Sequence, residues 1–233
     1  MSTSQASFVL IPGAGGAAWL WSRVVRELKA RGHDAIAVDL PAEDESAGLP
    51  EYAQVVLKAA ADRENIVLVG QSMGAFPAVQ VCDQLPVTTL VLVNPMIPNP
   101  GETPGEWWAN TGQEQAMRDN DLREGRSPDA EFDVNTYFLH DLPPDVLAEA
   151  GDNDRRQSEA IFGSPLNVSA WPTAPTRVIS GRDDRFFPLD FQRRLARERI
   201  GITPDVIPGG HLAALSHPAE LVDVLDTGRS IAH

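Results

Sequence analysis

Short apolar segments alternate with amphipathic ones over the first 93 residues of the chain. The apolar segments cover residues 8–11, 35–38, 66–69 and 89–93, and helical patterns run near residues 19–31, 49–61 and 73–85. Segments as apolar as these are typical of parallel strands that helices bury on both faces. The pattern therefore predicts an α/β fold with a mostly parallel sheet.

The alternation stops after residue 94 and resumes at residue 176. The residues between, 95–175, contain no clear strand and are rich in proline, glycine and acidic residues, yet include several aromatic residues. Because this segment is too long for a plain loop, we expect a mostly helical cap. Further strands are expected at 176–180 and 204–207, and helices near 189–199 and 213–225. The predicted organisation is a core of residues 1–94 and 176–233, with about six strands, and a cap of residues 95–175.

Composition narrows the class of partner. The 233 residues carry a formal net charge of -14, and an acidic surface repels both nucleic acid and anionic membranes. No apolar run of about 18 residues occurs, and the first seven residues lack the features of a secretion signal. Cys82 is the only cysteine, which excludes an intrachain disulfide. We expect a cytoplasmic protein that acts on a small molecule, and a homodimer is left open.

Gly70-Gln71-Ser72-Met73-Gly74 matches G-x-S-x-G, the pattern that surrounds a nucleophilic serine. The five residues directly follow an expected strand and precede an expected helix. A sharp turn at this point holds the serine in a strained conformation, and the flanking glycines remove side chains that would collide there. The start of the helix also offers free N–H groups. The pattern and its context predict Ser72 as the nucleophile.

A serine hydroxyl needs a base that accepts its proton. The candidates are His33, His140, His211, His217 and His233. His211 follows the last expected strand, at the carboxyl edge of the sheet where Ser72 also lies and where ligands bind in open α/β sheets. We therefore expect His211 to be the base, with His140 of the cap as the second candidate.

The base in turn needs a carboxylate that orients it. Asp183 and Asp184 follow the strand expected at residues 176–180, so both lie at the same sheet edge. We favour Asp184 and expect Asp183 to be a solvated turn residue. Asn94, which follows the fourth strand, cannot act as the acid.

The glycine-rich loop at residues 12–16 has two interpretations. In a serine hydrolase it would donate the Ala14 N–H to a developing oxyanion, together with the N–H of Met73. However, Gly13-x-Gly15-x-x-Ala18 also fits the dinucleotide fingerprint, with Asp39 ending the next strand. The dinucleotide interpretation leaves the serine, aspartate and histidine without a purpose, and neither tyrosine has the lysine four residues later that short-chain reductases carry. We therefore expect no cofactor and no metal.

Several segments resemble a known family. Residues 8–21, 39–41, 70–74, 184–192 and 210–218 resemble the α/β-hydrolase branch that contains plant methyl-salicylate-type esterases and hydroxynitrile lyases. The resemblance covers both ends of the chain and little of the cap. It implies the α/β-hydrolase fold, in which nucleophile, acid and base follow one another along the chain. One departure is Pro12-Gly13 where the family commonly has His-Gly, which affects the hydrogen bonds that shape the oxyanion loop.

The same resemblance favours an esterase over a lyase. The lyases resemble a pattern with threonine at the position of Gly13 and lysine after the catalytic histidine, where this chain has Leu212. The expected reaction is hydrolysis of a small, largely apolar carboxylic ester through an acyl-enzyme, with a lyase or a ligand-binding receptor as alternatives. Pocket residues are expected to be Gly13, Trp107, Trp108, Tyr137, Phe138 and Leu212. For the four aromatic residues, packing of the cap onto the sheet is the alternative role.

Overall fold

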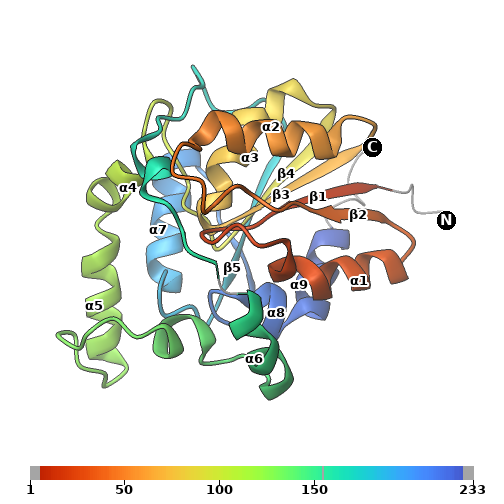
Figure 1. Cartoon of the computed structure of the whole chain (residues 1–233). Helices are drawn as coiled ribbons and strands as arrows, with labels where there is room; N and C mark the ends of the chain where they lie inside the picture. Colours follow the sequence, from red (N-terminus) through yellow and green to blue (C-terminus); the bar gives the residue numbers. More distant parts are fainter. Residues whose placement is uncertain (1–5, 154, 228–233) are drawn as a thin grey trace.

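The computed structural model describes residues 6–153 and 155–227, and one six-stranded parallel sheet forms its centre (Figure 1). The strands are β1 (Ser7–Ile11), β2 (Asp34–Ala37), β3 (Ile66–Gln71), β4 (Val87–Val93), β5 (Thr176–Gly181) and β6 (Asp205–Ile207). Every neighbouring pair in the sheet is parallel. The predicted α/β class and the six strands are confirmed, and the sheet is wholly rather than mostly parallel.

The order of the strands separates the two interpretations of the glycine-rich loop. The order is β2-β1-β3-β4-β5-β6, whereas the dinucleotide-binding fold has the order 3-2-1-4-5-6. Asp39 also has local partners, because its Oδ1 accepts the Ala18 N–H at 2.9 Å and lies 3.1 Å from Nη1 of Arg155. The structure therefore does not support the dinucleotide interpretation.

Helices cover both faces of the sheet, which explains the uninterrupted apolar strands. One face packs against α2 (Leu49–Ala60), α3 (Ala75–Val81) and α7 (Leu189–Ile200), and the other against α1 (Ser22–Ala30) and α9 (Pro218–Thr227) (Figure 1). Side chains alternate between the faces along a strand. In β1, Val9 and Ile11 belong to the first hydrophobic cluster, while Phe8 and Leu10 belong to the second. Both sets are fully buried.

The segment 95–175 contains helices and no strand among its described residues. These helices are α4 (Pro104–Thr111), α5 (Gln113–Arg123), the π-helical turn η4 (Asn135–Leu139), α6 (Pro144–Ala150), and the short η5 (Gly151–Asn153) and η6 (Glu159–Gly163). Trp107, Ile161 and Leu166 of this segment are buried in the same hydrophobic cluster as α2, α3 and α7. The segment therefore shares a core with the sheet, and its division from the core at residues 95 and 175 stays a prediction.

Three expected helices are divided in the structure. The helix expected over residues 213–225 consists of α8 (Ala213–Ser216) and α9, with His217 between them at φ -134° and ψ 53°. Pro218 explains this break, because a proline disfavours the helical conformation of the residue before it. The helix expected at 73–85 is α3 between the 3-10 turns η2 (Ser72–Gly74) and η3 (Cys82–Gln84), and η1 (Ala18–Trp21) precedes α1. Within the described residues, no helix combines the length and hydropathy that crossing a membrane would require.

A buried ion pair joins the segment 95–175 to α7. The side chains of Glu102 and Arg199 are 3% and 7% exposed, and Arg199 Nη2 lies 2.9 Å from Glu102 Oε1. Burial alone would raise the pKa of Glu102. Hydrogen bonds from Arg199, Asn110 and the Asn99 N–H outweigh this effect and hold the pKa below its ordinary value.

We expect this ion pair to make folding stability sensitive to acid. Because the folded-state pKa of Glu102 is lowered, its contribution is present above the ordinary value of 4.5 and is lost as pH falls through the folded-state pKa. Glu102→Gln should lower the free energy of unfolding at pH 7 by about 3 kcal/mol, since it leaves Arg199 without its buried partner. Urea denaturation at pH 7 and at lower pH checks this. The difference between wild type and variant should shrink on acidification, and an unchanged difference would contradict the assignment.

Candidate active site

Ser72 lies at the sharp turn between β3 and η2, and its φ is +51°. This left-handed conformation is unfavourable for a non-glycine residue and persists only where the surroundings enforce it. A Cβ on Gly74 would collide with the carbonyl oxygen of Pro12, and one on Gly70 would lie 2.7 Å from the carbonyl oxygen of Gly74. Both glycines of the motif are therefore required for the close packing that holds Ser72 in place.

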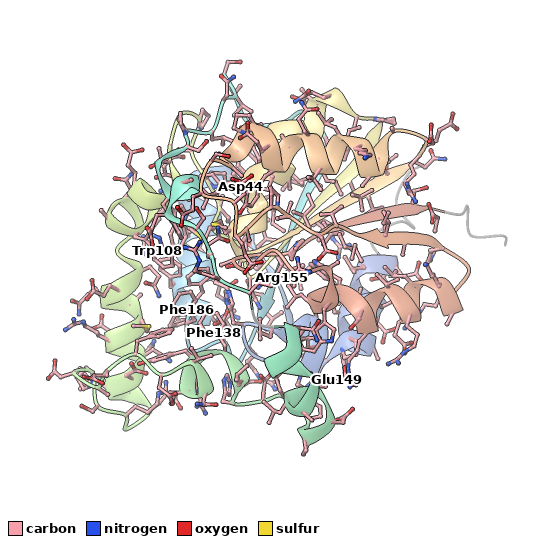
Figure 2. All side chains as sticks on the ribbon, viewed as in Figure 1. Asp44, Trp108, Phe138, Glu149, Arg155 and Phe186 are labelled. Carbon is pink, nitrogen blue, oxygen red and sulfur yellow. The ribbon has the colours of Figure 1, made fainter. Side chains whose placement is uncertain are left out.

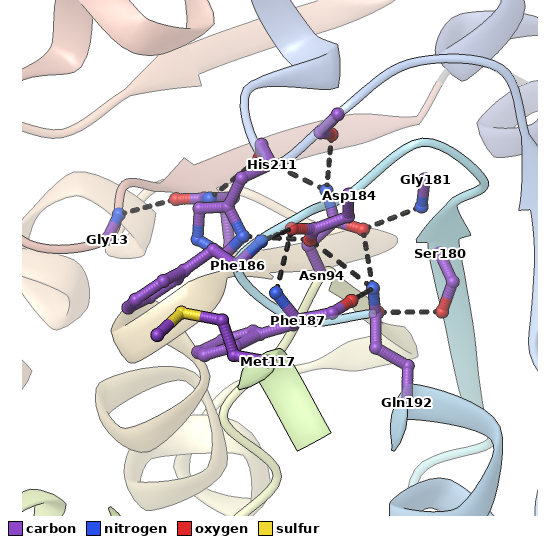
Figure 3. Close-up of polar contacts among 12 residues, drawn as sticks. Gly13, Asn94, Met117, Ser180, Gly181, Asp184, Phe186, Phe187, Gln192 and His211 are labelled. Carbon is purple, nitrogen blue, oxygen red and sulfur yellow. Dashed lines mark hydrogen bonds and ion pairs between the residues drawn. The ribbon is translucent and has the colours of Figure 1, made fainter. Parts of the chain in front are cut away.

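His211 and Asp184 form a buried pair at the same sheet edge (Figure 3). His211 follows β6 and Asp184 follows β5, and Nδ1 of the imidazole lies 2.9 Å from Oδ2 of the carboxylate. The other oxygen, Oδ1, accepts the N–H groups of Phe186 and Phe187 at 2.9 and 2.8 Å. Gln192 Nε2 lies 3.3 Å from Oδ2. The carboxylate is thus fixed in the position that orients an imidazole base.

Asp183 occupies a different environment from its neighbour. Its side chain is 48% exposed, lies 3.3 Å from the Arg182 guanidinium, and accepts the Gly209 N–H at 3.2 Å. Of the two candidate acids, Asp184 is the one that the structure brings to His211.

The other histidines lie away from Ser72 or have other partners. Both ring nitrogens of His140 are buried, and burial, together with Arg185, lowers the pKa of this histidine. His140 packs against Gly210 and does not line the cavity that contains Ser72. His33 Nε2 lies 3.1 Å from Asp226, His217 Nδ1 lies 2.9 Å from Ser216 Oγ, and His233 lies outside the described residues.

Asn94 connects the turn that carries the candidate acid, Asp184, with the loop that carries the candidate base, His211. Its Oδ1 accepts the Gly181 N–H at 2.7 Å, and its Nδ2 donates to the carbonyl oxygens of Gly210 and His211 at 3.0 and 3.1 Å. Sequence reasoning rejected Asn94 as an acid and assigned it no other role. The sequence did offer a signal for a structural role, because Asn94 directly follows β4 at the sheet edge where the candidate acid and base lie. Asparagine also tolerates the left-handed φ of +43° that it adopts there.

The loop expected to form the oxyanion hole, residues 12–16, has one N–H group without an acceptor between two that are bonded. The Gly13 N–H donates to Gln71 Oε1 and the Gly15 N–H donates to Gln157 Oε1, both at 3.0 Å. Within the described part of the chain, the Ala14 N–H has no acceptor. The Met73 N–H lies in the first turn of the helical stretch, where N–H groups have no intrahelical partner.

A cavity of about 760 Å³ brings these groups together. Ser72 and His211 line it, as do Ala14 and Met73 with their expected donor groups. Of the predicted pocket residues, it contains Trp108, Phe138 and Leu212, and its wall also includes Met96, Phe162 and Phe186. Figure 2 shows the side chains of Trp108, Phe138 and Phe186 gathered in this region.

Three predicted pocket residues lie elsewhere. Trp107 is fully buried in the core, where its indole N–H donates to the carbonyl oxygen of Ile97 at 3.0 Å. Trp107 points into the core while Trp108 lines the cavity, because consecutive residues of a helix point in different directions. The Tyr137 hydroxyl donates to Asp121 at 2.6 Å, and Gly13 packs behind Ser72, where a Cβ would lie 2.9 Å from the serine Cβ.

Three phenylalanine rings surround the imidazole of His211. The centroids of Phe138, Phe186 and Phe187 lie 5.1, 5.2 and 4.8 Å from that of the imidazole, each in an edge-to-face arrangement. They restrict the orientation of the ring and the access of water to it. Phe186 and Phe187 escaped the sequence reasoning, although they follow the acid almost directly and their N–H groups bind it.

Most of the described residues that line the cavity are apolar. Within this described part of the wall, Arg155 is the only arginine or lysine, and no aspartate or glutamate occurs. Among the described residues, no group of three or more histidine, cysteine, aspartate or glutamate side chains has an arrangement that could hold a metal ion. The described site therefore brings a serine, an imidazole held by a carboxylate, and the residues Ala14 and Met73 to one largely apolar cavity.

Comparisons with known proteins agree with this fold. A curated relative, norfluorocurarine synthase 1 of a Strychnos species, is 26% identical over 93% of this chain and 92% of its own. Probable esterase PIR7A of Oryza sativa subsp. indica is 36% identical over 42% of each chain. The crystal structure of polyneuridine aldehyde esterase shares the fold, with a TM-score of 0.77 over 97% of this chain and all of that one, at 19% identity. A model of the alpha/beta hydrolase family matches residues 8–224, and the chain belongs to that family.

Proposed function

We propose that this protein is a serine esterase that hydrolyses small, largely apolar carboxylic esters through an acyl-enzyme. The observation that carries the proposal is the buried His211–Asp184 pair, whose imidazole lines the same cavity as the strained Ser72. Two further observations support it, namely the unbonded Ala14 N–H and the Met73 N–H at the start of a helical turn. The esterase names of relatives such as PIR7A agree with this class of reaction.

In the proposed mechanism, His211 removes the proton of the Ser72 hydroxyl as Ser72 attacks the ester carbonyl. The Asp184 carboxylate keeps the Nδ1 proton of the imidazole in place, so that Nε2 is the basic nitrogen, and stabilises the imidazolium that forms. The N–H groups of Ala14 and Met73 stabilise the oxyanion. His211 then protonates the leaving alcohol, and a water molecule that it activates hydrolyses the acyl-enzyme.

The wall of the cavity supports an apolar ester rather than a charged one. Aromatic and aliphatic side chains, including Trp108, Phe138 and Leu212, form most of it. A lyase of this fold would need to stabilise a cyanide leaving group, and Leu212 beside His211 offers no charge for that purpose. A receptor that retains the triad would show tight ligand retention with slow turnover.

A direct comparison of substrates tests the proposed function. A panel of p-nitrophenyl esters of increasing acyl length should show turnover that is highest for short chains, with a burst of p-nitrophenol when deacylation is slow. A cyanohydrin assayed in parallel should release no cyanide above the uncatalysed rate. Cyanide release that exceeds ester turnover would replace the esterase with a lyase. Ligand retention without ester turnover would replace it with a receptor.

Gly13→Ala should impair the oxyanion loop. The added methyl would lie 2.6 Å from Gln71 Oε1 and 2.9 Å from the Ser72 Cβ, so the loop must move. Because loss of one oxyanion donor lowers kcat by about 100- to 1,000-fold, we expect a fall of that order. Gly163→Ala is the control, since a methyl there meets no atom within 4 Å. Equal activity of the two variants would contradict the assigned loop.

Trp107→Ala and Trp108→Ala should have different effects. Trp107 is fully buried in the core, and its removal should lower the free energy of unfolding by about 3–5 kcal/mol. Trp108 lines the cavity, so its removal should instead shift the ratio of kcat/KM for long and short acyl chains toward long ones. Urea denaturation and the ester panel measure the two effects. Two variants with the same loss of stability and the same substrate preference would contradict their separate placement.

A further inference from the structure

Gln71 is a buried polar residue at the end of an apolar strand. It is the last residue of β3, and its side chain is 3% exposed. Val67 and Val69 belong to the hydrophobic cluster on the α1 and α9 face of the sheet, and alternation along the strand directs Gln71 to that face. A buried amide is unfavourable unless its polar atoms have partners, so the partners of Gln71 indicate why an amide occupies this place.

The two ends of the Gln71 amide bind two different loops. Its Oε1 accepts the Gly13 N–H at 3.0 Å, and its Nε2 donates to the carbonyl oxygen of His211 at 3.2 Å (Figure 3 labels both partners). The first partner lies in the loop after β1, and the second in the loop after β6. One side chain therefore spans the space between the oxyanion loop and the loop of the base, directly beside Ser72.

We propose that Gln71 is a positioning residue that sets the place of the oxyanion donor relative to the nucleophile. This inference rests on the proposed esterase function. The Gly13 N–H and the Ala14 N–H belong to consecutive peptide groups, so a bond that fixes the first restricts the orientation of the second. A preorganised donor is effective because it does not need to reorient during the reaction.

The oxyanion loop depends on this bond more than the base does. Within the described residues, Gln71 is the acceptor for the Gly13 N–H, and the preceding Pro12 has no polar side chain that could accept this N–H in its place. The carbonyl oxygen of His211, in contrast, also accepts from Asn94 Nδ2 at 3.1 Å, and the imidazole itself is held by Asp184. Loss of the amide should therefore weaken oxyanion stabilisation and leave the base in place.

Gln71→Met removes both hydrogen bonds and keeps a side chain of similar length. We expect kcat for a p-nitrophenyl ester to fall by about 10- to 100-fold, the effect of a small misplacement of a reacting group. KM should stay within about threefold of the wild-type value. The affinity for a trifluoromethyl ketone, whose adduct with Ser72 carries an oxyanion, should fall by the same factor as kcat/KM. The midpoint of the acid limb of the pH profile of kcat/KM should not move.

Gln71→Asn provides a second variant if the methionine variant does not fold. Its amide is one methylene shorter and cannot reach both loops, so we expect losses of the same kind. Gln84→Met is the matched control, because Gln84 is exposed on η3 and donates only to the carbonyl oxygen of Gln80. Thermal unfolding and titration of the nucleophile with a fluorophosphonate give the amount of folded, reactive enzyme for each variant.

Two outcomes would overturn the inference. One is a folded Gln71 variant whose kcat and inhibitor affinity stay within threefold of the wild type. The other is a change in a different quantity alone. A raised KM would assign Gln71 to substrate binding, a smaller folded fraction would assign it to stability, and a displaced acid limb of the pH profile would assign it to positioning of the base. Ser72→Ala, assayed with the same esters, distinguishes a failure of the inference about Gln71 from a failure of the proposed esterase function. If Ser72→Ala is inactive while the Gln71 variants are active, only the inference about Gln71 fails.

Discussion

Replacing Ser72 with alanine should lower kcat for ester hydrolysis by about a million-fold, because no other described residue of the cavity wall carries a hydroxyl or thiol. The residual rate should reflect only the oxyanion donors and substrate binding. Stability should change little, since alanine and serine both carry a Cβ and meet the same backbone strain at φ +51°. Initial rates on p-nitrophenyl esters, together with urea denaturation, measure both effects.

Ser164→Ala is a suitable control for the serine substitution. Ser164 Oγ accepts the Leu49 N–H at 2.9 Å, so this variant also loses a serine hydroxyl, but outside the cavity. We expect it to lose stability and to retain its kcat. Wild-type activity in Ser72→Ala would contradict the proposed mechanism.

Replacing Asp184 with asparagine should lower kcat by about 10,000-fold, the effect expected when the orienting acid of a serine–histidine pair becomes an amide. An asparagine can offer the imidazole a donor in place of an acceptor, so His211 would adopt the wrong tautomer. The N–H groups of Phe186 and Phe187 can still bind the remaining oxygen, so the turn should keep its shape. Part of the lost activity should return at high pH if water or hydroxide can take over the role of the base.

The neighbouring substitution Asp183→Asn is the matched control. Asp183 carries the same carboxylate one residue earlier, but its side chain is exposed and contacts Arg182 and Gly209. We expect its kcat to stay within about threefold of the wild-type value. Comparable losses of kcat in the two variants, measured with one ester under the same conditions, would contradict the proposal that Asp184 orients His211.

Most of the fold could be predicted from hydrophobic patterning, because the inner strands β1, β3, β4 and β5 are largely buried and leave clear apolar runs, whereas the edge strand β6 is mostly exposed. The limits of helices were less predictable where local and tertiary effects compete. Pro218 divides the last expected helix at His217, and the spacing of apolar residues along the sequence does not reveal this break. The cap was predicted as helical, but its packing into the core through Trp107, Ile161 and Leu166 requires three-dimensional contacts.

The three residues of the proposed triad could be selected from the sequence because each follows a strand, and parallel strands end at one edge of a sheet. The pocket residues were predictable only in part. Trp108, Phe138 and Leu212 line the cavity as expected, but Trp107 and Trp108 have the same chemistry, and only the rotation of α4 directs one into the core and the other to the cavity. The side chains that support the site escaped prediction for a related reason. Gln71, Asn94 and Gln157 act through backbone groups of distant loops, and such partners leave no pattern in the sequence.

The most direct test of the central claim is to identify the residue that becomes acylated. The protein is quenched in acid during turnover of a p-nitrophenyl ester, and intact mass and peptide mapping locate the added acyl group. Asp184→Asn, in which deacylation should be slow, is treated in the same way. We predict a single acyl group on Ser72 that disappears with time. An acyl group on another residue, or full turnover without any covalent adduct in either protein, would contradict the account.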